Sequence, residues 1–96
     1  MVTVKDLKFS PQSHNGIGAI LKTKSRLILS VQAGQGLYST PRADGLDPEN
    51  YSAFEVAIID IKGDFVTDKF IDCGGDKVAG WVSRERINDL INFLDK

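Results

Sequence analysis

Two residues in this chain have side chains suited to nucleophilic or general-base chemistry, His14 and Cys73, and each is the single residue of its type. A catalytic histidine requires a nucleophile and a third group that orients its ring. Cys73 would supply the nucleophile, but it lies between Asp72 and Asp76, and neighbouring carboxylates raise the pKa of a thiol. We therefore predict no catalytic residue, and a Cys/His enzyme stays an alternative.

Acidic residues gather in two loops, where clustered carboxylates can bind hard cations. The acids of one loop are Asp72 and Asp76, and those of the other are Asp44, Asp47 and Glu49. Neither loop has the alternating acids, the glycine and the distant glutamate of an EF-hand. Gly34-Gln35-Gly36 also lacks the lysine and the following helix of a phosphate-binding loop. We predict no metal site and no cofactor, and a metal-dependent enzyme stays an alternative.

Aromatic and arginine side chains in and beside one long loop suggest binding. Tyr38, Arg42 and Tyr51 lie there, and Trp81 comes just before a predicted helix. Tyrosine, tryptophan and arginine dominate the energetics of many protein interfaces. The other interpretation is that Tyr51 and Trp81 anchor the loop onto the core. We take Tyr38, Arg42 and Tyr51 as the candidate binding residues.

The segment from Phe54 to Phe65 predicts a strand, a tight turn at Lys62-Gly63 and the start of a second strand. Its first part is apolar on both sides. Phe54, Val56 and Ile58 point one way, and Ala57, Ile59 and Ile61 point the other. Because a strand with one solvated face would alternate apolar and polar residues, we predict a central strand that needs cover on both faces.

The remaining patterns predict the rest of the sheet and one helix. We expect a short edge strand over 2–9, a hairpin of strands 17–23 and 26–32, a second hairpin over 54–70 and a short strand over 78–82. Ser83 is the expected N-cap of a helix. Its apolar stripe at helical spacing comprises Ile87, Leu90, Ile91 and Leu94.

These elements predict one α+β domain over residues 1–96, with a long loop at about 33–52 in which Asp47-Pro48 is typical of the start of a helical turn. The architecture is a mostly antiparallel sheet of four to five strands built from two hairpins, with the C-terminal helix packed on one face. The other face would contain Ile20, Ile28, Ala57 and Ile59. The long loop, curling of the sheet or a second protein chain could cover it.

Composition excludes several classes of protein. The net charge of −1, from 12 basic and 13 acidic residues, argues against nucleic-acid binding, which needs a basic surface. A single cysteine allows no intrachain disulfide. No apolar run approaches the roughly 20 residues of a membrane span, and the N-terminus lacks the apolar stretch of a secretory signal. We expect no membrane association and a cytoplasmic location, in the host cytoplasm if the protein is viral.

Five segments share their order with a known group of proteins. They are Leu7-Lys8-Phe9, Asn15-Gly16-Ile17-Gly18, Gly36-Leu37-Tyr38-Ser39, the 54–65 hairpin and Asp76-Lys77-Val78-Ala79-Gly80-Trp81. In this order the chain resembles small uncharacterised phage and prophage proteins. The resemblance implies a viral origin and a short accessory protein that acts in an infected cell. The group has no assigned activity, so the resemblance implies no site residue.

The sequence therefore favours a non-enzymatic accessory protein that binds a host or viral protein. The contact would involve Tyr38, Arg42 and Tyr51, or a strand added at a sheet edge. The alternative is a homodimeric structural protein that pairs its bare sheet face or an edge strand across a twofold axis.

Overall fold

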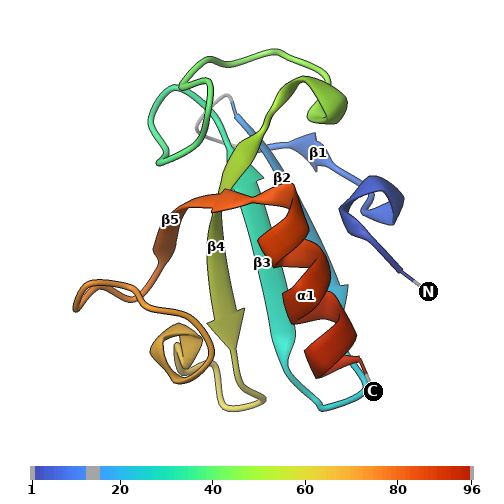
Figure 1. Ribbon diagram of the computed structural model, residues 1–96, viewed down its shortest axis with the longest axis vertical. Coiled ribbons are helices and arrows are strands. Elements are labelled where there is room, and N and C mark those ends of the chain that lie inside the picture. Colours follow the sequence, from blue (N-terminus) through green and yellow to red (C-terminus); the bar gives the residue numbers. More distant parts are fainter. Residues whose placement is uncertain (1, 13–15, 96) are drawn as a thin grey trace.

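Five antiparallel strands form one sheet in the order β1-β2-β3-β4-β5, so strands adjacent in space are also consecutive in the chain. The computed structural model describes residues 2–12 and 16–95. The strands are β1 (Ser10–Pro11), β2 (Ile17–Lys22), β3 (Ile28–Ala33), β4 (Ala53–Ile59) and β5 (Ala79–Ser83). The helix α1 (Arg84–Leu94) lies against one side of the sheet (Figure 1). This arrangement confirms the predicted α+β class.

The helix begins and packs as its sequence predicts. The Ser83 side chain accepts a hydrogen bond from the Arg86 backbone N–H at 3.1 Å, which satisfies one amide of the first helical turn. The stripe of Ile87, Leu90, Ile91 and Leu94 is buried. Complete burial of one such side chain stabilises the fold by about 1.5–3 kcal/mol. The stripe therefore fixes α1 to the sheet.

The core lies between α1 and the middle strands. Side chains of β3 and β4 that are fully buried on this side are Leu29, Val31, Ala33, Phe54, Val56 and Ile58. The β3–β4 register places Leu29 opposite Ile58 and Val31 opposite Val56, so these side chains share one face. The predicted central position of the Phe54 strand is thus confirmed.

The N-terminal segment differs from the strand that its loose alternation predicts. Residues Val4–Asp6 form a 3-10 helix, η1, and only Ser10–Pro11 pair with β2. One local and one long-range hydrogen bond explain the difference. The Thr3 backbone N–H donates to Asp6 Oδ2 at 2.8 Å, and the Val4 N–H donates to Asn88 Oδ1 of α1 at 2.8 Å. The segment therefore turns toward the helix, where Val4 is buried.

The second hairpin is shorter than predicted. After the turn at Gly63, Phe65 forms only an isolated bridge with Ile59, and the chain enters a 3-10 helix, η3 (Thr67–Lys69). The buried Thr67 hydroxyl explains why no strand continues. Its Oγ1 accepts from the Ile58 N–H at 2.9 Å and donates to the Lys77 carbonyl at 2.7 Å. The strand β5 pairs with the other end of β4, at Ala53, Phe54 and Val56.

The long loop is held at one end of the sheet (Figure 1). The Thr40 N–H donates to the Ala53 carbonyl at 2.9 Å, and the buried Ser39 hydroxyl accepts from the Gly34 N–H at 3.1 Å. A 3-10 helix, η2 (Pro48–Asn50), follows Asp47 as predicted, although the Asp47 side chain makes no capping hydrogen bond. The loop therefore packs against the strand ends, and Ile20 and Lys22 on the second face stay exposed.

Candidate binding surface

The side of the sheet away from α1 is the first candidate for a binding surface. Strand register identifies its residues, because directly paired residues of antiparallel strands share a face. Ile20 pairs with Ser30 and Ser30 with Ala57, while Lys22 pairs with Ile28 and Ile28 with Ile59. Together with Gln32 and its partner Glu55, we call these residues the open face: Ile20, Lys22, Ile28, Ser30, Gln32, Glu55, Ala57 and Ile59.

Large apolar side chains on and beside the open face are accessible to solvent. Ile20 is 69% exposed. Phe65, which bridges Ile59 and so lies on the same side, is 44% exposed. Ser30 and Ala57, on the two middle strands of this face, are buried because longer neighbouring side chains extend past these small ones. The predicted face of Ile20, Ile28, Ala57 and Ile59 therefore exists, and the long loop does not cover Ile20.

Trp81 lies at the β5 border of this face in an unusual backbone conformation. Val56 pairs with Ala79 and Phe54 with Val82, so Gly80 and Trp81 together oppose one residue of β4. Such a β-bulge changes the direction of a side chain, and bulges are common beside functional sites. Trp81 has a φ of 52°, which is rare for a bulky residue, and its side chain is 56% exposed. The side chain of the single tryptophan is therefore exposed to solvent, and its backbone conformation is energetically unfavourable for a bulky residue.

Tyr38 and Arg42 extend the border that Trp81 begins. The Tyr38 and Trp81 ring centroids are 4.8 Å apart, and Arg42 Cζ lies 5.5 Å from the Tyr38 centroid. The Trp81 backbone N–H donates to the Tyr38 backbone carbonyl at 2.8 Å. A Cβ added at Gly80 would lie 2.8 Å from the Tyr38 Cβ, so the absence of a side chain there permits the contact. We call Tyr38, Arg42 and Trp81 the aromatic cluster.

Tyr51 is separated from the other two predicted binding residues. Its side chain is only 1% exposed, and its ring packs against Phe54 with centroids 6.0 Å apart. Its hydroxyl donates to the Ala43 carbonyl. Tyr51 therefore anchors the long loop to the core, as the second interpretation holds for this residue, whereas Trp81, which that interpretation also placed against the core, is 56% exposed. The structure brings Tyr38 and Arg42 together, and it adds Trp81 to them.

Cys73, the described member of the candidate catalytic pair, is not activated by its surroundings. Burial, followed by the nearby Asp68, Asp72 and Asp76 carboxylates, raises the pKa of the Cys73 thiol and so disfavours the reactive thiolate. His14 lies outside the described residues. Asp72 Oδ1 accepts the Gly74 N–H at 2.9 Å, which stabilises a turn. Within residues 2–12 and 16–95, no group of three or more His, Cys, Asp or Glu residues could hold a metal ion.

The glycine-containing segment that superficially resembles a phosphate loop uses its amides internally. The Gly34 N–H donates to Ser39 Oγ at 3.1 Å, and the Gln35 N–H donates to Asp44 Oδ1 at 2.8 Å. The Asp44 carboxylate therefore accepts a backbone N–H that a bound phosphate would need as a hydrogen-bond donor. Gly34-Gln35-Gly36 consequently forms a loop that is stabilised by its own chain.

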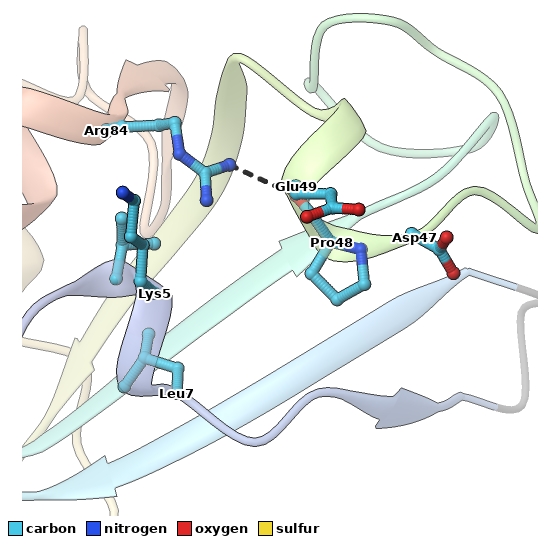
Figure 2. A pocket seen from close by; sticks show the side chains of 7 residues that line it. Lys5, Leu7, Asp47, Pro48, Glu49 and Arg84 are labelled. Atoms are coloured by element: carbon cyan, nitrogen blue, oxygen red, sulfur yellow. Dashed lines mark hydrogen bonds between the residues drawn. The ribbon is translucent and has the colours of Figure 1, made fainter.

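A groove of about 570 Å³ lies between η1, η2 and the start of α1. Figure 2 shows Lys5, Asp47, Glu49 and Arg84 around it. Arg84 Nη1 donates to the Pro48 and Tyr51 carbonyls at 3.0 and 2.6 Å, and its guanidinium lies 5.4 Å from the Phe54 ring centroid. At this groove Arg84 therefore joins the long loop to the start of the helix.

Comparisons with known proteins assign this chain to no family. No family model matches the sequence, and neither curated proteins nor solved structures give a match. In the part of the chain that the structure describes, no helix is long and apolar enough to cross a membrane. Functional inference therefore depends on the surface chemistry.

Proposed function

We propose that this protein is a non-enzymatic protein-binding module and that its contact surface is the open face together with the aromatic cluster. The observation that supports this function best is Trp81, which is exposed in a left-handed backbone conformation at the border of the open face. Strained backbone at a bulky residue persists where surrounding structure enforces it, and such sites are often functional.

The types of residue at this surface also favour binding. Tryptophan, tyrosine and arginine are the residues most often found at energetic hot spots, and all three meet in the aromatic cluster. Ile20 and Phe65 would add apolar area on the rest of the surface. The raised pKa of the Cys73 thiol supports a function without nucleophilic catalysis.

The resemblance to phage and prophage proteins suggests where such a module would act. We propose an accessory role in an infected cell, with a host or viral protein as the partner. Self-association is a second candidate, because β1 pairs only with Ile17 and Gly18 and no other described strand pairs with the outer edge of β2. An exposed strand edge is a template for pairing with another chain. Sedimentation that shows a monomer at every accessible concentration would remove this second candidate.

Variants on opposite sides of the molecule test the proposed function. The double variant Ile20→Ser/Trp81→Gly alters the open face, and glycine accommodates the positive φ at position 81. Phe93→Ser is the matched control, because Phe93 is 61% exposed on α1. In affinity capture from a lysate of the source organism or its host, we expect proteins that bind the wild type and Phe93→Ser but not the double variant. Retention of the same proteins by all three forms would contradict the proposal.

A further inference from the structure

The outer edge of β2 presents backbone hydrogen-bonding groups that point away from β3. In an antiparallel pair, successive residues of a strand direct their N–H and C=O groups to opposite sides. The Thr23 N–H donates to the Leu27 carbonyl at 2.9 Å, and the β2–β3 register continues from this pair, so Leu21 is hydrogen-bonded to β3 as well. The backbone groups of Ile20 and Lys22, which alternate with these residues, therefore point to the outer edge.

Only the beginning of this edge is occupied by β1. This strand pairs with the first two residues of β2, and within residues 2–12 and 16–95 no other strand pairs with the same edge. Just before β1, the Phe9 ring stacks on Phe54 of the core with centroids 5.7 Å apart. The preceding chain therefore turns toward the core and does not follow β2. Ile20 and Lys22 are both exposed, as an open edge requires.

The opposite edge of the sheet, formed by β5, is less suited to pairing. The bulge at Gly80 and Trp81 interrupts its ladder with β4 and bends the strand. The Trp81 backbone N–H is already bonded to the Tyr38 carbonyl. Bulges are among the features by which natural proteins prevent strand addition at an edge. The free edge of β2 has no such interruption, because its pairing with β3 is continuous.

We propose that the partner contributes an extended segment that adds to β2 as an antiparallel strand in line with β1. This inference rests on the proposed function and specifies how the partner attaches to the open face at its β2 border. The segment would exchange backbone hydrogen bonds with Ile20 and Lys22, and its side chains opposite them would lie on the open face. An apolar residue opposite Ile20 would form a cross-strand pair with this exposed side chain.

A second copy of this chain fits the β2 edge poorly. If two copies paired about a twofold axis at Leu21, the partner's Lys24 would have to lie opposite Gly18. Ser10 of β1 already occupies that position. In addition, the Lys24 N–H donates to Asp95 Oδ1 at 2.9 Å, which holds this residue in the turn after β2. An axis nearer β1 meets the same obstacle, and an axis nearer the turn leaves too few residues to pair. A separate segment with its own ends avoids both problems.

Hydrogen exchange at single amides tests the strand directly, with linear peptides selected on the wild type from a random display library as the probe. In the free protein we expect fast exchange at the Ile20 and Lys22 amides and slow exchange at the Leu21 amide, which is bonded to β3. Saturating peptide should slow the first two by about tenfold or more and leave Leu21 unchanged. N-methylation of alternate peptide residues should abolish binding, and N-methylation of the residues between them should be tolerated.

Lys22→Pro tests the same contact from the side of the protein. Proline lacks the outward N–H, and a strand tolerates proline where that N–H faces solvent. Lys22→Ala is the matched control, because it removes the same side chain and retains the N–H. We expect Lys22→Pro to lower peptide affinity about tenfold and Lys22→Ala to keep it within about twofold. If circular dichroism shows that Lys22→Pro does not fold, the exchange measurement and the N-methyl series decide the question.

Each other result separates this inference from the proposed function. Peptides that lose binding with Ile20→Ser/Trp81→Gly but leave exchange at Ile20 and Lys22 unchanged would overturn strand addition and keep the binding surface. Equal loss of affinity in Lys22→Ala and Lys22→Pro would place the contact at the lysine side chain and would also overturn it. Slow exchange that increases with protein concentration in the absence of peptide would show that a second copy occupies the edge. A selection that yields neither a peptide dependent on the open face nor slower exchange would overturn both proposals.

Discussion

The two faces of this sheet are formed by the same strands but differ in what covers them. On one side, Phe54, Val56 and Ile58 of β4 are fully buried beneath α1. On the other side, Ile20 of β2 stays mostly exposed, and the residues across the face from it are the small Ser30 and Ala57. An apolar pattern on both sides of a strand therefore shows that each side favours apolar neighbours. It does not show that the same chain provides them.

The largest contrast between the faces should appear when a core side chain is removed. Phe54→Ala deletes a fully buried ring that contacts Phe9, Tyr51 and the Arg84 guanidinium. We expect a loss of about 3–5 kcal/mol in the free energy of unfolding, because a large cavity replaces the ring. Urea denaturation followed by circular dichroism measures this loss. A loss as small as that of an exposed residue would contradict the assignment of this face as the core.

Arg84→Ala tests whether the groove beside α1 is structural. The change removes two hydrogen bonds from a charged donor to the Pro48 and Tyr51 carbonyls. We expect a loss of about 2–3 kcal/mol in stability and faster amide hydrogen exchange in η2. Affinity capture of the proteins that bind the open face should stay unchanged once the variant is folded. Loss of that binding in folded Arg84→Ala would place the contact at the groove instead.

Gly80→Ala should disturb the aromatic cluster more than the core. The added methyl group would lie 2.8 Å from the Tyr38 Cβ, so the Tyr38 backbone has to move. We expect a stability loss of about 1–2 kcal/mol from overpacking, with greater acrylamide quenching of Trp81 fluorescence as Tyr38 separates from it. Unchanged quenching would show that Tyr38 does not shield Trp81. Gly36→Ala is a matched control, because a Cβ there meets no atom within 4 Å.

Ile20→Ser should leave stability almost unchanged. Because Ile20 is largely exposed, we expect a change within about 0.5 kcal/mol in urea denaturation. Solubility should improve, since the variant exposes less apolar surface. A loss of several kcal/mol would mean that an unrecognised element covers Ile20, and the comparison between the two faces would fail.

The smallest effect concerns Cys73 and appears as a pH dependence. Burial and then the Asp68, Asp72 and Asp76 carboxylates raise the pKa of this thiol. Its reaction with a disulfide reagent at neutral pH should therefore be slower than that of a peptide thiol, and Asp68→Asn should accelerate it. Since the folded thiol retains its proton to higher pH than the unfolded thiol, stability should fall as the pH rises above the ordinary thiol pKa. Faster reaction than the peptide thiol would contradict this assignment.

The sequence predicted those helices and strands whose apolar residues recur at a regular spacing. The stripe of α1, the β2–β3 hairpin and the apolar pattern of β4 each identified an element and its buried side. The N-terminal 3-10 helix was missed because its hydrogen bonds to Asp6 and Asn88 outweigh a loose alternation of apolar residues. The predicted strand after Gly63 is too long. Beyond Phe65 the Thr67 hydroxyl, and not a strand backbone, forms a hydrogen bond with the β4 backbone.

The candidate surface was predicted less completely. Residue type identified Tyr38 and Arg42, but residue type alone cannot distinguish an exposed tyrosine from the buried Tyr51. The exposure of Trp81 depends on a bulge whose register is fixed by pairing between β4 and β5. The contact between Lys77 and Phe65 joins residues 12 apart through an irregular loop, and no local signal indicates it.

The central claim is that the open face, and not the helix side, contacts a partner. A photoreactive benzoylphenylalanine at position 20 or at position 93 tests it most directly, because Ile20 and Phe93 are both exposed and lie on different sides of the molecule. After irradiation in a lysate of the source organism or its host, we predict a discrete cross-linked protein from position 20 and none from position 93. Cross-links from position 93 alone, or none from position 20, would contradict the account.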